Sequence, residues 1–300
     1  MTLPTAASLF ERLPRFFRRH KLMLGWMKLT GESALQLVRI RDESFGFADM
    51  SDGFLRLIVI DGDFEADFFR IADALLARGG VFIDAGANYG LLSFGMAGQF
   101  SDRVNFHLFE PNPKLVPSIH KSLALYPQMR CKIHQTALSD HEGSVTLLFN
   151  PTQSGASHIA SDGSGEEAAS TTLDHYFERE HLKRIELLKM DVEGFEMAVL
   201  RGARRSLQTQ SIRAVYFEYF QKFLGRVEPP GDVLEFLESF EYEVCFCRSF
   251  DLKTYGAATH TLRKGLPGHG LQLLPIRGHV RPKGTDLLAV PKGSLVPLVN

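Results

Sequence analysis

A short apolar strand that ends in a glycine turn constrains this sequence more than any other feature. The stretch VFIDAGANYG, residues 81–90, joins an apolar run to an acid, two glycines and an asparagine. Further along the chain, apolar runs alternate with helical patterns. This alternation predicts right-handed βαβ crossovers and a parallel sheet with helices on both faces. We therefore expect an α/β fold with a doubly wound, mostly parallel sheet.

The expected elements follow one another from residue 64 onward. Strands are predicted at 80–85, 103–109, 131–136, 184–190 and 211–217, and helices at 64–76, 90–99, 112–125, 194–207 and 231–239. The stretches FEYEVCFCRSF and TDLLAVP predict two further strands near the C-terminus. Short β-rich runs between residues 33 and 61 predict a small meander. We expect residues 1–62 to form an N-terminal helical and β extension and residues 63–300 to form the main domain.

Composition excludes several classes of protein. With 300 residues, 44% of them hydrophobic, the chain can bury a large core, and its formal charge of −1 argues against nucleic-acid binding. The three cysteines lack CxxC spacing, so neither a disulfide framework nor a zinc site is expected, and a cytoplasmic location fits best. No apolar run approaches the roughly 20 residues needed to span a bilayer, so we expect a soluble protein.

Two segments leave alternatives open. The start of the chain, LFERLPRFFRRHKLMLGW, mixes Phe, Leu and Arg and can form an amphipathic helix on a membrane, although Pro14 interrupts it. Helix packing on the same chain or on a second subunit is the commoner outcome, so this segment is also a candidate for a homo-oligomer contact. Residues 150–170 are rich in Ser, Gly and Ala, which predicts either a disordered insertion or a mobile flap over a site.

The glycine turn lies where open α/β sheets bind ligands, at the carboxyl end of the first strand. A dinucleotide fingerprint needs G-x-G-x-x-G, but Asn88 stands in the place of the second glycine and Tyr89 follows it. Asp84, two residues before Gly86, would repel a pyrophosphate and suits a ligand that carries an ammonium group. The turn therefore favours S-adenosylmethionine over a dinucleotide.

The next two strand ends extend the expected cofactor site. Glu110 follows Gly86 by 24 residues and can accept hydrogen bonds from both ribose hydroxyls of either cofactor class. Ala137 and Ser139 leave room for an adenine edge, and Asp140 can accept from its amino group. Each residue alone has a plain structural explanation, such as a tight turn or a helix cap. Their order at three successive strand ends favours a nucleoside-cofactor site.

These residues resemble those of the FkbM family of S-adenosylmethionine-dependent methyltransferases. The matching stretches are FIDAGANYGLLSF, LFEPNPKLVPSI, TALSDHEGSVTL, TTLDHYF and LLKMDVEGFEMAVLRGA, within residues 64–220. The resemblance implies a class I fold with seven strands, the last one antiparallel, and O-methylation of small molecules such as sugar, glycolipid or polyketide-type hydroxyls. The expected cofactor contacts are Glu65, Asp84, Gly86, Ala87, Asn88, Tyr89, Gly90, Glu110, Pro111, Asn112, Ala137 and Leu138.

The stretch KMDVEGFE supplies the candidate catalytic groups. An alcohol is a poor nucleophile near neutral pH, so a base must remove its proton. Asp191 and Glu193 follow the fourth parallel strand and can act as that base, or they can share a divalent cation such as Mg²⁺. His158 is the rival base. Glu196 is expected only to complement the dipole of the following helix.

Three functions compete at this point. A small-molecule O-methyltransferase is favoured. A methyltransferase of a macromolecule is less favoured, because no Asn-Pro-Pro-Tyr motif follows the fourth strand and no basic and aromatic stripe is present. A non-catalytic cofactor-binding protein has no need of acids at the end of that strand.

Overall fold

The structure is a computed structural model. It describes residues 19–31, 33–52, 65–150, 154, 158–159, 165–220, 232–249, 271–276 and 284–294.

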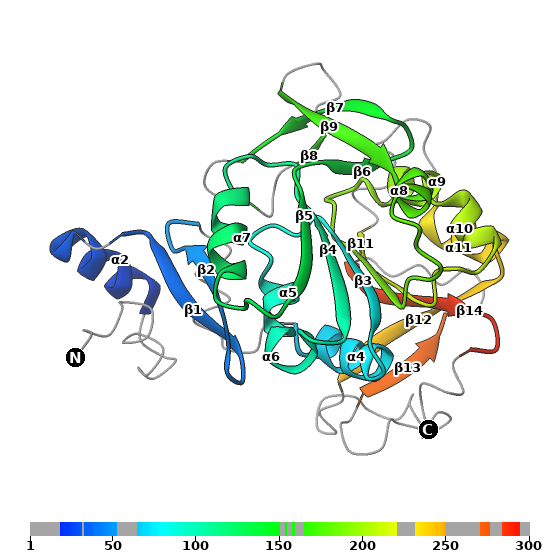
Figure 1. Cartoon of the computed structure of the whole chain (residues 1–300), viewed down its shortest axis with the longest axis horizontal. Coiled ribbons are helices and arrows are strands. Elements are labelled where there is room, and N and C mark those ends of the chain that lie inside the picture. The colour runs from blue at the N-terminus through cyan, green and yellow to red at the C-terminus, as the bar shows by residue number, and fades with distance from the viewer. Residues whose placement is uncertain are drawn as a thin grey trace.

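An eight-stranded sheet forms the centre of the molecule (Figure 1), in the order β13-β12-β14-β11-β10-β3-β4-β5. Its strands are β3 (Gly80–Ala85), β4 (Val104–Phe109), β5 (Arg130–His134), β10 (Leu187–Met190), β11 (Val215–Phe220), β12 (Tyr242–Ser249), β13 (Leu271–Pro275) and β14 (Gly284–Pro291). The strands from β5 to β11 pair in parallel, whereas β14 is antiparallel to both β11 and β12.

The predicted doubly wound, seven-stranded class I sheet is confirmed, with one addition. Strand β13 pairs with β12 at the sheet edge as an eighth strand. The sequence gives little sign of it, because its five residues lie within a Gly- and Pro-rich stretch. Strand β11 begins at Val215 rather than at 211, since Ile212 makes only an isolated bridge with Ile185.

Helices cover both faces of the sheet. One face packs against α4 (Ala66–Leu76), α5 (Leu91–Gly95), α6 (Ala97–Phe100) and α7 (Val116–Leu123). The other packs against α8 (Leu173–Arg179), α9 (Glu196–Arg201), α10 (Arg204–Gln208) and α11 (Val233–Ser239). The single helix predicted at 194–207 is therefore two helices. They meet at Gly202, where a Cβ atom would lie 2.0 Å from the carbonyl oxygen of Ser139.

A second sheet lies above the carboxyl ends of the central strands (Figure 1), in the order β6-β9-β7-β8. Its strands are β6 (Ala137–Ser139), β7 (Gly143–Leu148), β8 (His158–Ile159) and β9 (Glu166–Thr172). The prediction that 150–170 is a loop throughout is wrong, because β8 and the first half of β9 pair with β7. Small residues such as Ala168 are buried against β7, so their size misled the prediction.

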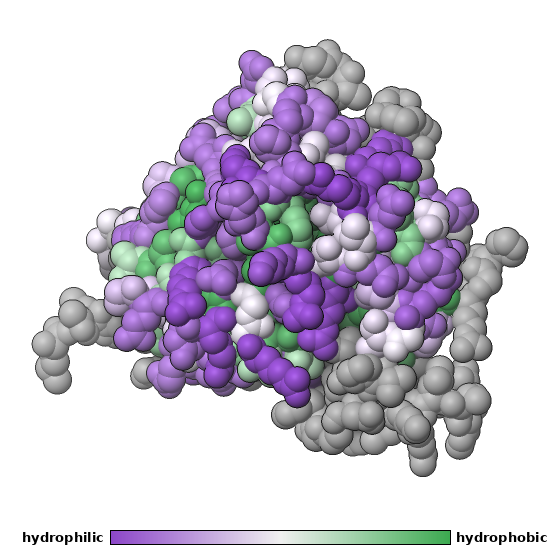
Figure 2. Space-filling model, turned by 45° about the vertical axis from the view of Figure 1, so that its right-hand side comes forward, coloured by the Kyte–Doolittle hydropathy of each residue, from purple (hydrophilic) through white to green (hydrophobic). Residues whose placement is uncertain are grey.

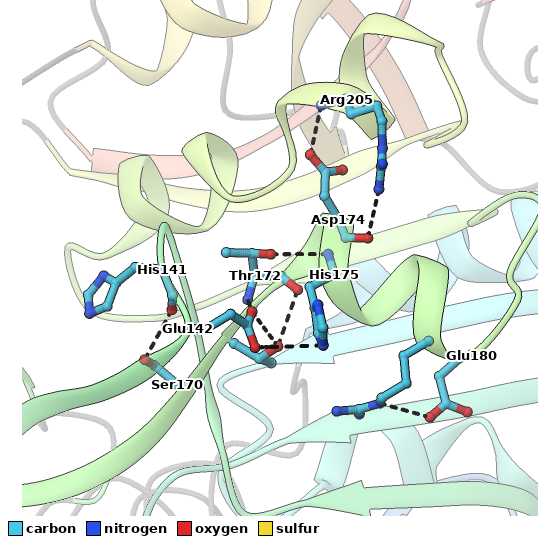
Figure 3. A network of polar contacts seen from close by, with 10 residues as sticks. His141, Glu142, Ser170, Thr172, Asp174, His175, Glu180 and Arg205 are labelled. Atoms are coloured by element: carbon cyan, nitrogen blue, oxygen red, sulfur yellow. Dashed lines mark hydrogen bonds and ion pairs between the residues drawn. The ribbon is translucent and has the colours of Figure 1, made fainter.

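Polar contacts fasten one end of the second sheet to the helices beside it (Figure 3). The carboxylate of Glu142 accepts hydrogen bonds from the backbone N–H of Thr172 at 2.6 Å and from the Thr171 hydroxyl at 2.9 Å. The Thr172 hydroxyl in turn caps α8 by accepting from the N–H of His175. Asp174 accepts from the N–H of Arg205 at 2.8 Å and so ties α8 to α10.

The N-terminal extension contains α2 (Arg19–Thr30) and the hairpin of β1 (Leu35–Arg41) and β2 (Ser44–Asp49). Met27 of α2 packs in an apolar cluster with Val38, Met50 and Tyr89, which joins the extension to the glycine turn. The third run of the expected meander, FLRLIVID, lies outside the described residues.

The surface is mostly polar on the side shown in Figure 2, where hydrophobic residues emerge only between hydrophilic ones. Among the helices that the structure describes, each is too short or too polar to cross a bilayer.

Candidate active site

A pocket opens between the carboxyl ends of the central strands and the second sheet, with about 680 Å³ of empty space that includes open solvent at its mouth. Its polar lining comes from Asn88, Glu110, Asp191 and Glu193. Its apolar lining comes from Phe109, Pro111, Ala137, Leu138, Leu147, Phe149, Val192 and Phe195, with Gly86 and Ser154 completing the wall. The pocket therefore has one carboxylate-rich side and one apolar side roofed by β7.

Gly86 brings two strand ends unusually close together. Its φ of +75° favours glycine, and a Cβ atom there would lie 2.0 Å from the carbonyl oxygen of Asp191. The glycine is thus required by the approach of the β3 turn to the end of β10. This close approach places Asp191 on the wall of the pocket beside the turn.

Glu110 is held in place by the backbone around it. One carboxylate oxygen accepts from the N–H of Asn88 at 2.7 Å and the other from the N–H of Asn112 at 2.8 Å. Each oxygen keeps a further lone pair for a hydroxyl donor. The Asn88 side-chain oxygen is buried and has no hydrogen-bond partner in the described residues. The polar side of the pocket therefore offers acceptors to a ligand that brings donors.

Asp84 lies beneath the pocket. It is fully buried, its Oδ2 accepts from the Ser93 hydroxyl at 2.7 Å, and its Oδ1 lies 3.5 Å from the Lys189 ammonium. The Lys189 ammonium also lies 3.3 Å from Asp191 Oδ2 and 3.4 Å from the Gly86 carbonyl oxygen. Burial acts to lower the pKa of Lys189, but the carboxylates of Asp191 and Asp84 outweigh it and raise that pKa above its ordinary value.

More carboxyl groups surround this lysine than its charge can balance. Asp191, Glu193 and Glu218 each present an oxygen within 4.8 Å of the others. Asp286 is the register partner of Glu218 across the antiparallel pair β11–β14. Glu65, at the N-terminal cap of α4, accepts a hydrogen bond of 3.5 Å from the Tyr216 hydroxyl on the same strand as Glu218. We call these five carboxyl groups, those of Glu65, Asp191, Glu193, Glu218 and Asp286, the acidic cluster.

Burial and mutual repulsion raise several of these pKa values. Burial, then the charges of Asp191 and Glu193, raise the pKa of Glu218 to about 9. Burial and the Asp286 charge raise the pKa of Glu65 to about 7. Outside the cluster, burial raises the pKa of Glu110 to about 7.

Stability should therefore fall as pH rises. An acid with a raised pKa in the folded state contributes stability that is full below its unfolded pKa, near 4.5, and is lost as pH passes through the folded value. We expect the free energy of unfolding of the ligand-free protein to drop between pH 6 and 9 by on the order of 2 kcal/mol, with allowance for solvent screening. Urea unfolding across this range measures it.

The variant Glu218→Gln should flatten this pH dependence, because a neutral amide replaces the acid whose pKa is raised most. Asp102→Asn, at an exposed acid outside the acidic cluster, is the matched control and should leave the slope unchanged. Equal slopes in both variants and the wild type would contradict the assignment to Glu218.

The structure brings most of the predicted site residues together. The pocket wall includes the predicted cofactor residues Gly86, Asn88, Glu110, Pro111, Ala137 and Leu138 and the predicted catalytic residues Asp191 and Glu193. For the other catalytic candidate, His158, the structure describes only the backbone, which pairs with Leu148.

Six predicted cofactor residues do not line this pocket: Glu65, Asp84, Ala87, Tyr89, Gly90 and Asn112. Asp84 faces Lys189 instead, and the Tyr89 side chain packs in the cluster around Met27. Asp140 bonds to the ring of its neighbour His141 at 2.7 Å. Glu196 does begin α9, as expected, but it is buried and accepts from the Gly194 N–H at 3.3 Å.

Glu218 and Asp286 are the main residues that sequence reasoning missed. They lie in strands that read as apolar runs, and an antiparallel pairing across 67 intervening residues brings them together. Phe109 and Phe195 were also missed on the apolar side of the pocket, although each lies within a quoted motif. The position of Phe109 directly before Glu110 was the available signal.

The part of the chain that forms this pocket is similar in sequence to known proteins. Residues 84–244 match the methyltransferase FkbM domain. Methyltransferase 1 of Beauveria bassiana is 28% identical over 142 residues, covering 40% of this chain and 57% of that protein. The 2-O-methyltransferase NoeI of Sinorhizobium fredii is 24% identical over 192 residues, covering 57% and 76%. The crystal structure of an FkbM methyltransferase from Methylobacillus flagellatus superposes with a TM-score of 0.43 at 14% identity, covering 70% and 43%.

Proposed function

Because the chain belongs to the FkbM methyltransferase family, we propose that it transfers a methyl group from S-adenosylmethionine to a hydroxyl of a small molecule. The acceptors that fit this proposal are a sugar, a glycolipid or a polyketide-type natural product. NoeI is named as a 2-O-methyltransferase. The chain aligns with little more than half of the length of Methyltransferase 1. The main support for this proposal is that Asp191 and Glu193 line the same pocket as the glycine turn and Glu110.

The pocket fits this cofactor by its chemistry. Glu110, held by two backbone N–H groups, suits the two ribose hydroxyls. The unpartnered Asn88 oxygen suits a donor such as the methionine ammonium, a role that Asp84 does not fill directly because it faces Lys189. Ala137, Leu138 and Phe109 offer an apolar slot for the adenine ring. When bound, the cofactor supplies an electrophilic methyl group on a sulfonium.

Asp191 is the proposed base. One of its oxygens lies 3.3 Å from Lys189, which fixes the carboxylate at the end of β10. Its place on the pocket wall lets it take the proton of an acceptor hydroxyl. Glu193 lies on the same wall with φ +52°, a strained backbone for a glutamate that the turn after β10 imposes.

A cation is the alternative way to activate the acceptor. Asp191, Glu193 and Glu218 offer three oxygens of the kind that Mg²⁺ prefers. Such an ion would lower the pKa of a hydroxyl bound to it. EDTA then abolishes turnover and Mg²⁺ restores it, whereas the base mechanism is indifferent to EDTA.

The test of the proposed reaction is release of S-adenosylhomocysteine in the presence of a panel of hydroxylated acceptors. Release with a sugar or natural-product alcohol supports the proposal. Methylation only of a protein or RNA fraction would favour a macromolecular substrate, and binding without release would favour a non-catalytic cofactor-binding protein.

We expect S-adenosylmethionine and S-adenosylhomocysteine to bind with micromolar affinity and NAD not to bind. Glu110→Ala removes the ribose acceptor and should weaken binding by about one to two decades, since a charge-assisted hydrogen bond contributes about 1.5–3 kcal/mol. Calorimetry measures both. Asp102→Ala, at an exposed acid outside the pocket lining, is the control and should bind normally. Wild-type protein that binds NAD and neither sulfur nucleoside would refute the cofactor assignment.

A further inference from the structure

Helix α2 carries an uncovered apolar face. Leu22, Trp26 and Leu29 are 49%, 42% and 83% exposed, and their spacing of four and then three residues places them along one side of the helix. Met27, on another side, packs into the body of the protein. Figure 1 shows α2 at one end of the molecule, beyond β1. The helix thus packs against the rest of the protein on one side and exposes leucine and tryptophan side chains to solvent on the other.

Charge in this chain is divided unevenly. Residues 1–30 contain six Lys or Arg residues and one Glu, a formal charge of +5 in a chain whose total is −1. The remaining 270 residues therefore carry −6. Lys28, which is exposed on α2, belongs to the basic part. Such asymmetry indicates that the basic segment meets an anionic partner that the acidic body does not.

A second copy of the chain fits this surface poorly. A symmetric contact would place the same α2 face of two copies together and bring two basic helices, neither of which contains an acidic residue, into proximity. Three exposed side chains on one helix also fall well short of the roughly 800 Å² per partner that a stable dimer buries. A tryptophan and leucines beside basic residues are instead typical of helices that lie in the interface of a bilayer.

We propose that α2 binds the surface of an anionic lipid bilayer, with Leu22, Trp26 and Leu29 inserted among the lipids and the basic residues near the headgroups. The oligomer contact expected from the sequence is the alternative use of the same face and stays a prediction. Because Met27 and Tyr89 share one cluster, a docked α2 holds the glycine turn and its pocket close to the membrane. The proposal does not depend on methyl transfer, since lipid binding is measured without turnover.

Trp26 is the single tryptophan of the chain and therefore reports on its own face of α2. The full-length protein is titrated with phosphatidylcholine vesicles that contain or lack phosphatidylglycerol. We expect a blue shift of the emission and co-sedimentation with the anionic vesicles, both lost at high salt, because headgroup attraction is screened.

Two variants and one control test the surface. Leu29→Glu should weaken vesicle binding about tenfold or more, because it puts a charge into the inserted face. Lys28→Glu should weaken it by a similar factor, since each basic residue near an anionic surface adds about fivefold and this change also introduces a negative charge. Leu125→Glu replaces a leucine that is 41% exposed at the end of α7 and should bind as the wild type does.

Three results would overturn the proposal. One is a Trp26 emission that is unchanged by anionic vesicles. Another is equal weakening by Leu29→Glu and Leu125→Glu. The third is a dimer, seen by sedimentation without lipid, that Leu29→Glu dissociates, since α2 would then cover a second copy.

Discussion

Replacement of Asp191 by Asn should lower the rate of methyl transfer by about 10²–10⁴ and leave S-adenosylmethionine binding intact. The amide keeps the shape of the side chain and an oxygen toward Lys189, but it cannot accept the proton of the acceptor hydroxyl. Cofactor affinity should persist because Glu110 and Asn88 hold their own backbone contacts. Single-turnover rates together with calorimetry separate the two effects.

The comparison variants identify the base. Asp102→Asn, at an exposed acid two residues before the start of β4, should turn over normally. Glu193→Gln should have a smaller effect than Asp191→Asn if Asp191 alone takes the proton, and a similar effect if the two share a cation. Near wild-type rates in both variants, together with a loss in His158→Ala, would transfer the role to the histidine.

Among glycine-to-alanine substitutions in the glycine turn, Gly86→Ala should lower the stability of the protein most. An alanine there meets a positive φ and places its Cβ 2.0 Å from the Asp191 carbonyl oxygen. Positive φ costs roughly 1–2 kcal/mol for an L-residue, and a collision between two backbones adds about 1–3 kcal/mol or more. We expect a loss of about 3 kcal/mol or more in the free energy of unfolding, measured by urea denaturation.

Gly293 provides the matched control. Its φ of +81° is close to that of Gly86, but a Cβ atom there would have nothing within 4 Å. Gly293→Ala should therefore show the conformational cost alone, about 1–2 kcal/mol. If both variants lose the same stability, the close approach of Gly86 to Asp191 contributes nothing.

Local patterns predicted the parallel half of the sheet closely. Strand β3 has the predicted bounds, and β4 differs by one residue, because each is a short buried run bounded by polar or glycine residues. The second sheet was harder to predict. Its strand β9 is EEAASTT, which lacks the large branched side chains typical of strands, and its pairing with β7 comes from tertiary contacts.

The pocket residues that lie in short motifs directly after a strand could be predicted from the sequence. Gly86, Asn88 and Glu110 follow their strands directly and lie on the pocket wall as expected. The partner of Asp84 was not predictable, because Lys189 lies in a different strand and reaches Asp84 only through the parallel register of β3 and β10. The sequence suggested a ligand ammonium for this acid, and the protein supplies its own.

The acidic cluster also bears on how a reaction at this site would end. Lys189 provides one positive charge against several carboxyl groups, so the pocket attracts cations. In the proposed reaction the cofactor enters as a sulfonium and leaves as a neutral thioether, and the methylated acceptor carries no charge in its place. The spent cofactor has therefore lost the charge that the cluster attracts. In the proposed reaction the cluster would therefore attract the fresh donor more strongly than the spent one, which favours exchange after each turnover.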